Sequence, residues 1–257
     1  MYQLPEDHAL VLRTSDVNRI SHNGFQWPES GPVEAPDWNQ EPICGGGLHG
    51  ALWGEGNGSL FNWDGDATWQ VVEVLEKDIV DLEGKVKFPR GNVIFSGDQQ
   101  GATNFILANG VFGRAVIGAG VSNLSPYNHV LAGYKGTATA GDYGKATAGF
   151  GGTANVGDWG TANAGEGGTA TAGYNGTANA GFGGTATAGI WGKATAGDYG
   201  TVNALDYGTA NAGIGGKISI DYWDGTRSRT KGGYIGEDGL EPNTPYKLDE
   251  TFNFVKA

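Results

Sequence analysis

Runs of hydrophobic residues separated by polar residues mark four strands in the first half of the chain. Residues 8–14 and 68–75 are rich in Val and Leu with partial alternation, which predicts two strands. Residues 85–89 and 92–97 predict two more, and the Pro-Arg-Gly sequence at 89–91 marks a break between them.

One helix is predicted after these strands. Within residues 98–110 the apolar residues recur at three- and four-residue spacing, Asp98 stands at the N-cap position, and Gly110 follows the last periodic residue. Together with the strands, this helix predicts a small α+β domain over residues 1–125.

The pattern changes completely at Gly136, where an octapeptide array begins. Its consensus is Gly-Thr-Ala-Thr/Asn-Ala-Gly-x-x, and residues 128–135 form a degenerate first unit in the same register. A fixed period means stacked units, each burying one face on its neighbours. The glycines that open the units are Gly136, Gly144, Gly152, Gly160, Gly168, Gly176, Gly184, Gly192, Gly200 and Gly208, with Gly216 opening a degenerate last unit.

A second period doubles the first. The eighth position is bulky in odd-numbered units and Gly in even-numbered units, except for Tyr199, and Lys replaces Thr only in even units, at Lys145 and Lys193. The repeat is therefore sixteen residues, which predicts one coil of a two-sided β-solenoid over residues 126–216, with coils about 4.8 Å apart. Residues 217–257 are predicted to form a C-terminal β cap that starts with a hairpin at Asp224-Gly225.

The alternation of side chains in a strand decides which residues face inward. Ala138 and Ala140 share one side of the first full unit, and Thr137 and Thr139 share the other. We expect Ala inside and Thr or Asn in outward ladders, with the aromatic residues at the seventh and eighth positions stacked from coil to coil. The inverse arrangement, with Thr and Asn buried as a hydrogen-bonded ladder, is the alternative.

Composition excludes several classes of protein. The net charge of −12 argues against nucleic-acid and anionic-membrane binding, and no apolar run of 18 residues predicts a membrane span. The single cysteine, Cys44, permits no intrachain disulfide and indicates a reducing compartment. Since the N-terminal residues have no secretory signal pattern, we expect a cytoplasmic protein. We also expect no cofactor and no bound metal.

The side chains with the greatest capacity for catalysis or metal binding lie in and just after the Gly-rich stretch at 44–56. Cys44 and His49 could form a nucleophile pair, but we expect a structural thiol and a turn histidine bonded to backbone. Glu55, Asp64 and Asp66 could bind calcium, although a solvated turn is the simpler interpretation.

A small basic group follows, formed by Lys85, Lys87 and Arg90. We expect these three side chains to be solvent-exposed charges on strands, and a local anion-binding site is the alternative. Arg13, His49 and Glu73 have the residue types and order of an ADP-ribosyltransferase, which makes a nucleotide-using transferase a third functional alternative.

Several segments resemble those of an uncharacterised family of phage and bacterial proteins. That family joins a Gly-Leu-His N-terminal domain to Gly-Thr-Ala-Thr-Ala-Gly arrays and a short β cap; the matching segments here include CGGGLHGALWGEG, the array and YIGEDGLEPNTPYKLDE. The resemblance implies a phage or prophage origin and an intracellular setting, and it identifies Cys44, Gly47, Leu48 and His49 as motif residues without giving them a role.

Two hypotheses for the array follow. The leading one is a non-catalytic interaction protein of phage or prophage type, which presents a rigid acidic repeat surface to a host or phage protein and is open to self-association. The alternative is ice or ordered-water binding through outward Thr-x-Thr rows. The candidate binding residues are Thr137, Thr139, Thr153, Thr169, Thr171, Thr185, Thr187, Trp159, Trp191, Asp142 and Asp158.

Overall fold

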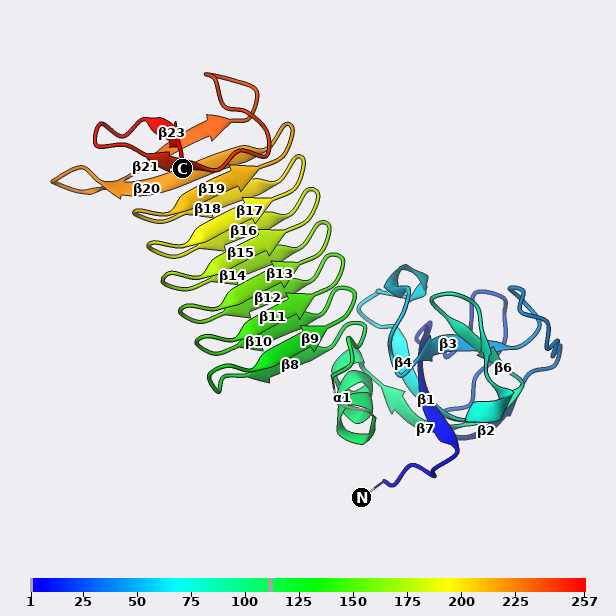
Figure 1. Ribbon diagram of the computed structural model, residues 1–257. Helices are drawn as coiled ribbons and strands as arrows, with labels where there is room; N and C mark the ends of the chain where they lie inside the picture. The colour runs from blue at the N-terminus through cyan, green and yellow to red at the C-terminus, as the bar shows by residue number, and fades with distance from the viewer. Residues whose placement is uncertain (1, 111–112) are drawn as a thin grey trace. The chain divides into compact units, whose positions relative to one another are not determined.

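The computed structural model describes residues 2–110 and 113–257. The chain divides into two compact units, Met1–Gly120 and Val121–Ala257, each with its own core. Figure 1 shows the first unit in blue to green and the second in green to red.

The first unit is built on a seven-stranded sheet with the order β2-β7-β4-β1-β3-β6-β5 and antiparallel pairing throughout. The four predicted strands are confirmed, although β7 already includes Arg90 and Gly91, so that Pro89 alone separates it from β6. The strands are β1 (His8–Ser15), β2 (Gly31–Glu34), β3 (Leu48–Leu52), β4 (Thr68–Leu75), β5 (Val80–Asp81), β6 (Val86–Phe88) and β7 (Arg90–Gly97).

The predicted helix is also confirmed, as α1 (Gln99–Asn109). The Asp98 carboxylate caps it by accepting a hydrogen bond from the Gly101 amide at 2.7 Å. The helix buries Ala102 and Ile106, and two short 3₁₀ turns, η1 (Gly58–Leu60) and η2 (Glu76–Asp78), complete this unit.

The second unit is a β-solenoid with two sheets of eight strands each. From β8 to β20 the even-numbered strands form one sheet and the odd-numbered strands the other, and we call these the even sheet and the odd sheet. The even sheet holds β8 (Gly120–Asn123), β10 (Thr137–Ala140), β12 (Thr153–Val156), β14 (Thr169–Ala172), β16 (Thr185–Ala188), β18 (Thr201–Ala204) and β20 (Lys217–Trp223), and ends in β21 (Ser228–Tyr234). The odd sheet holds β9 (His129–Ala132), β11 (Lys145–Ala148), β13 (Thr161–Ala164), β15 (Thr177–Ala180), β17 (Lys193–Ala196) and β19 (Thr209–Ala212), and ends in β22 (Tyr246–Leu248) and β23 (Phe254–Lys256).

The sixteen-residue coil is confirmed by the strand register. Thr137 pairs with Thr153, and Thr153 with Thr169, in parallel and without slippage. The odd sheet repeats this, with Thr161 opposite Thr177. Each octapeptide therefore contributes one strand and one turn, and Figure 1 shows the strands stacked at regular intervals.

Alanine fills the interior of the solenoid. Ala138, Ala146 and Ala154 are completely buried, and so are their equivalents in later coils. Valine enters the same layer at Val156 and Val202. The alternative with Thr and Asn buried is thus wrong, because the two sheets lie close enough for Ala to fill the space between them.

The turns explain why Gly recurs and where it can be replaced. A Cβ atom added to Gly141 would lie 2.1 Å from the carbonyl oxygen of Leu124 in the preceding coil, so this position excludes side chains. The eighth position has a positive φ in both kinds of turn, 61° at Gly151 and 60° at Trp159. A non-Gly residue there is strained by roughly 1–2 kcal/mol, which the ring contacts described below offset.

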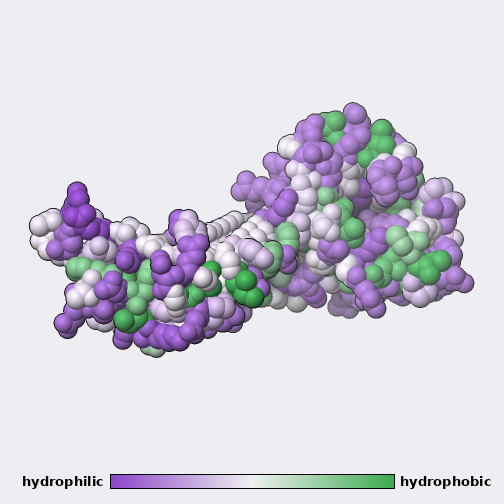
Figure 2. Space-filling model, turned by 90° about the horizontal axis from the view of Figure 1, so that it is seen from above, coloured by the Kyte–Doolittle hydropathy of each residue, from purple (hydrophilic) through white to green (hydrophobic). Residues whose placement is uncertain are grey.

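The C-terminal residues close the stack. The predicted hairpin joins β20 to β21, with a loop in which the Asp224 amide bonds the Arg227 carbonyl at 3.1 Å. Across the odd sheet β22 runs antiparallel to β19 and buries Tyr246. Seen from above in Figure 2, this end mixes hydrophilic and hydrophobic side chains.

Candidate water-binding face

All seven threonines singled out from the sequence lie on the outer face of the even sheet, on β10, β12, β14 and β16. They form two columns, of which the first is unbroken from Thr137 to Thr201. We call this surface the threonine face. Its members are Thr137, Thr153, Thr169, Thr185 and Thr201 in the first column, and Thr139, Asn155, Thr171, Thr187 and Asn203 in the second.

The threonine face is a regular and rigid array of hydroxyl groups. Side chains two residues apart on one strand are about 6.8 Å apart, and equivalent side chains on adjacent strands about 4.8 Å. Thr is β-branched, so χ1 has little freedom and each hydroxyl and methyl keeps its orientation. The strand register fixes the positions of the hydroxyl groups, and the restricted χ1 angles fix the directions in which they point.

Most of these hydroxyls are available to water. Within residues 2–110 and 113–257, none of the threonine side chains from Thr137 to Thr185 on this face hydrogen-bonds to another group of the protein. The last two strands differ, since Asn203 donates to the Thr187 hydroxyl at 3.4 Å and Ser219 donates to Asn203 at 2.7 Å. The free array therefore covers the coils nearer the start of the solenoid.

The outer face of the odd sheet is different, and we call it the lysine face. Its first column is interrupted by the exposed side chains of Lys145 and Lys193. In its second column the Asn179 amide donates to Asn163 at 3.0 Å, so these polar groups satisfy each other. No strand of this face has Thr at both outward positions; its members are His129, Lys145, Thr161, Thr177, Lys193 and Thr209, and Leu131, Thr147, Asn163, Asn179, Thr195 and Asn211.

Trp159 and Trp191 do not belong to either face. They occupy the eighth position of their octapeptides, in the turns that follow even-numbered strands, and there their rings stack on rings of the neighbouring coil. Tyr143 stacks on Trp159 with ring centroids 6.2 Å apart, and Trp191 on Tyr207 at 4.5 Å. About half of each indole is exposed. These rings support coil-on-coil packing as predicted.

Asp142 and Asp158 lie in the same turns and bond to backbone. Each carboxylate accepts a hydrogen bond from an amide sixteen residues further along, Asp142 from Asp158 at 2.9 Å and Asp158 from Tyr174 at 2.8 Å. Asp198 does the same for Ile214 on the opposite turns. The aspartates thus link successive coils.

Arg13 and Glu73 lie on opposite faces of the sheet in the first unit, because Arg13 pairs with Gln70 and Glu73 pairs with Leu10 across β1 and β4. Arg13 is buried against the Trp27 ring and donates to Gln70 at 2.6 Å, and burial lowers the pKa of its guanidinium to about 9. Glu73 accepts a hydrogen bond from the Tyr2 hydroxyl. This separation removes the geometric basis for a transferase site.

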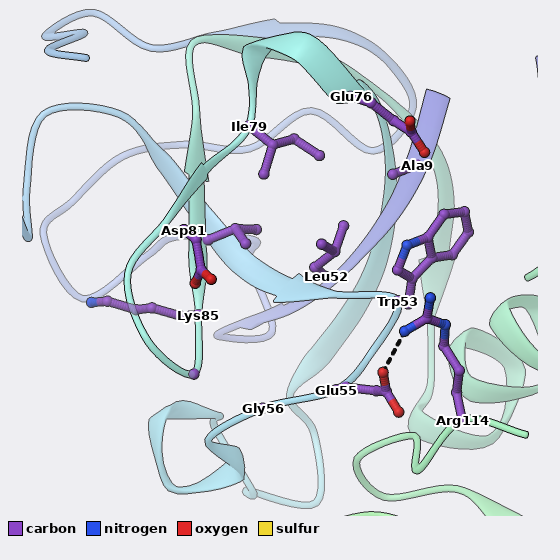
Figure 3. Close-up of a pocket in the computed structure, with 12 residues that line it drawn as sticks. Ala9, Leu52, Trp53, Glu55, Gly56, Glu76, Ile79, Asp81, Lys85 and Arg114 are labelled. Atoms are coloured by element: carbon purple, nitrogen blue, oxygen red, sulfur yellow. Dashed lines mark hydrogen bonds and ion pairs between the residues drawn. The ribbon is translucent and has the colours of Figure 1, made fainter. Parts of the chain in front are cut away.

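A cavity of about 420 Å³ lies in this unit. Leu52, Trp53 and Ile79 are among the side chains that line it (Figure 3). Glu55 faces it, but its carboxylate is bound by Arg114 at 2.6 Å and by the Ala115 amide at 2.8 Å. Among the described residues no group of three His, Cys, Asp or Glu side chains could hold a metal, and no helix is long and apolar enough to span a membrane.

The Gly-rich stretch and the basic group that follows it depart from expectation in three respects. Cys44 is exposed, with the Lys85 ammonium 3.0 Å from its sulfur, which is not the environment of a structural thiol. Lys87 is not a solvated charge, because it is completely buried on β6. His49 lies in β3 rather than in a turn, and its Nε2 atom is buried without a hydrogen-bond partner among the described residues.

Comparison with known proteins bears on the function directly. An ice nucleation protein of Pseudomonas syringae is 45% identical over 104 residues, which are 40% of this chain and 9% of that protein. An ice nucleation protein of Xanthomonas campestris pv. translucens is 40% identical over 105 residues, 7% of its length, and InaU of Pantoea ananas is 40% identical over 108 residues, 10% of its length. The chain therefore matches about a tenth of these relatives or less. No family model matches the chain, and no solved structure matches it.

These relatives overturn the leading hypothesis from the sequence. The interaction protein of phage or prophage type is wrong as the main interpretation, because the similar proteins are named for ice nucleation, and the phage origin has no support. What remains of the resemblance is the repeat architecture itself. The ice-binding alternative agrees with the relatives.

Proposed function

We propose that the threonine face binds ordered water and thereby ice. The observation that carries this proposal is the unbroken first column, Thr137 to Thr201, whose strands are in exact parallel register. The names of the relatives support it independently.

The physical argument rests on preorganisation. Water molecules bound at a fixed two-dimensional spacing lose freedom, and a rigid surface avoids the further entropy cost of ordering its own side chains. Threonine offers a hydroxyl for hydrogen bonding and a methyl that restricts water between the hydroxyls. The lysine face has neither a regular row of hydroxyl groups nor rigid side chains throughout, because Lys145 and Lys193 bring long, flexible, strongly hydrated cations into its first column.

The proposal is tested by thermal hysteresis, the gap between the melting and freezing points of an ice crystal in protein solution, together with droplet freezing temperatures. Thr169→Tyr places a bulky ring on the threonine face, and Thr177→Tyr places the same ring at the same octapeptide position on the lysine face. We expect the unchanged chain to show an effect on ice, Thr169→Tyr to lose most of it, and Thr177→Tyr to retain it.

Both variants must keep the melting temperature of the parent for the comparison to count, and Tyr is well tolerated on strands. If the parent chain changes neither the growth nor the nucleation of ice, the proposed function is wrong. Equal losses in the two variants would mean that ice is not bound by one particular face.

A further inference from the structure

Charged side chains are excluded from the strands of the repeat array, with two exceptions. Within residues 136–215, all of which the structure describes, every Asp and Glu lies in a turn, whereas the two basic residues, Lys145 and Lys193, lie on strands of the odd sheet. Both lysine side chains are exposed, and among the described residues neither ammonium has an ion pair or a hydrogen bond. The two lysines therefore make no polar contact that stabilises the fold.

The lysines stand where Thr-x-Thr would otherwise form on the lysine face. Thr147 follows Lys145 on β11, and Thr195 follows Lys193 on β17. The strands of this face that begin with Thr, which are β13, β15 and β19, have Asn at the second outward position instead. Each of these five strands thus lacks one of the two threonines, and on β11 and β17 the missing one is replaced by Lys.

Two lysines are enough to affect the whole first column of the lysine face. In the parallel register Lys145 lies beside Thr161, and Lys193 lies between Thr177 and Thr209. Because adjacent strands are about 4.8 Å apart, every threonine of this column has a lysine as its direct neighbour. An ammonium is strongly hydrated and its stem is flexible, so the water that it holds moves with the side chain and does not fit a fixed lattice.

The threonine face has the complementary arrangement on the same backbone. Its first column has Thr on every strand from β10 to β18, and the column ends where Lys217 takes the same position on β20. The layer below is alike on both sheets, since Ala170 of the even sheet and Ala178 of the odd sheet are both completely buried. The first outward position, Thr or Lys, is therefore a principal difference between the two faces.

We infer that Lys145 and Lys193 are specificity-determining residues that restrict ice binding to the threonine face. This role rests on the proposed function, and it means that the odd sheet has the backbone of a second ice-binding face, which the lysines keep inactive. Replacing both lysines with Thr completes a first column of five threonines on the odd sheet, as many as on the threonine face, and gives Thr-x-Thr on β11 and β17. The chain with its lysines binds ice on one side and presents a hydrated, charged face to the solution.

A gain of ice binding in a chain whose threonine face is blocked tests this role. Thr169→Tyr blocks that face, and Lys145→Thr and Lys193→Thr are then added together. Lys145→Arg and Lys193→Arg in the same blocked chain are the matched control, because Arg keeps both the charge and the length of the side chain. The fraction of protein taken up by slowly growing ice is measured, together with thermal hysteresis. We expect the two Thr replacements to recover most of the parent's uptake and the two Arg replacements to recover none.

The melting temperatures should stay alike, because Thr suits exposed strand positions. If the blocked chain with both Thr replacements melts earlier, Lys193→Thr alone must recover part of the uptake for the inference to stand. No recovery, in a series where the parent binds ice and Thr169→Tyr does not, would overturn the inference and leave the proposed function intact. Equal recovery with Arg would also overturn it, since charge would then not be the excluding property. A parent chain that ice does not take up contradicts the proposed function instead.

Discussion

At the scale of single residues, the solenoid depends on side chains that link one coil to the next. Asp142, Asp158 and Asp198 at the seventh position accept backbone hydrogen bonds from the following coil, and rings at the eighth position stack on the rings of the next coil. The sequence indicated the stacking rings, because the bulky eighth positions recur every sixteen residues. It did not indicate the aspartate bonds, since a repeated Asp in a turn is equally consistent with simple solvation.

Asp158→Ala tests the role of these aspartates. It leaves the Tyr174 amide without its 2.8 Å partner, and we expect the solenoid to lose about 1 kcal/mol of stability. Asp206→Ala is the control, because Asp206 lies at the same turn position without a side-chain hydrogen bond to another described residue. Chemical unfolding of both variants decides the matter, and equal losses would contradict the coil-linking role.

His49 gives the first unit a pH-dependent stability. Its folded pKa is lowered, first by burial and then by the charges of Lys85 and Lys87, so the unfolded chain takes up a proton at a higher pH than the folded protein does. Stability should therefore be constant above about pH 6.5, the ordinary histidine value, and decline as the pH falls below it.

His49→Gln should weaken this decline, whereas His22→Gln, which changes an exposed histidine, should preserve it. Urea unfolding at pH 5 and pH 7.5 measures the difference for each variant. A decline of the same size in the parent and in His49→Gln would show that other groups are responsible.

At the scale of elements, each octapeptide works because inward Ala and outward Thr alternate on four-residue strands. Ala170 is completely buried between the two sheets, while Thr169 beside it is exposed. Ala170→Leu should overpack this layer and cost roughly 1–3 kcal/mol. Thr169→Ser, on the same strand, should be nearly neutral.

Thermal melts of the two variants measure this difference. Val156 and Val202 show that single inward positions take two more methyl groups, so Leu should be tolerated better beside them. A destabilised Thr169→Ser beside an unchanged Ala170→Leu would mean that the assignment of the faces is reversed.

Most elements were predictable because their signals are local. Gly spacing gives the coil length, alternation gives the buried face, and Asp98 gives the start of α1. The surroundings of Cys44 and Lys87 were not predictable, because they depend on a loop folding over β6 more than forty residues away in the chain. The same holds for Arg13, whose burial follows from its pairing opposite Gln70.

At the scale of the whole molecule, the doubled repeat gives the solenoid two unlike faces. Because Lys145 and Lys193 lie in even-numbered units, both fall on the odd sheet and leave the threonine face free of charge up to Thr201, beyond which Lys217 continues the first column. The sequence contained this asymmetry in the positions of Lys145 and Lys193, but its meaning became clear only when the coil placed alternate units on opposite sides.

The central claim is that the threonine face binds ice, and a gain of activity tests it most directly, since misfolding cannot produce one. Asn155 interrupts the second column between Thr139 and Thr171. Asn155→Thr would give Thr-x-Thr on four successive strands of the even sheet, whereas Asn211→Thr creates the same motif on the lysine face beside Lys193.

Thermal hysteresis at equal concentrations of the parent and the two variants is the measurement. We predict a larger hysteresis for Asn155→Thr and the parent value for Asn211→Thr, with melting temperatures alike. Unchanged or reduced hysteresis in Asn155→Thr, or an equal increase in Asn211→Thr, would contradict the claim that this one face binds ice.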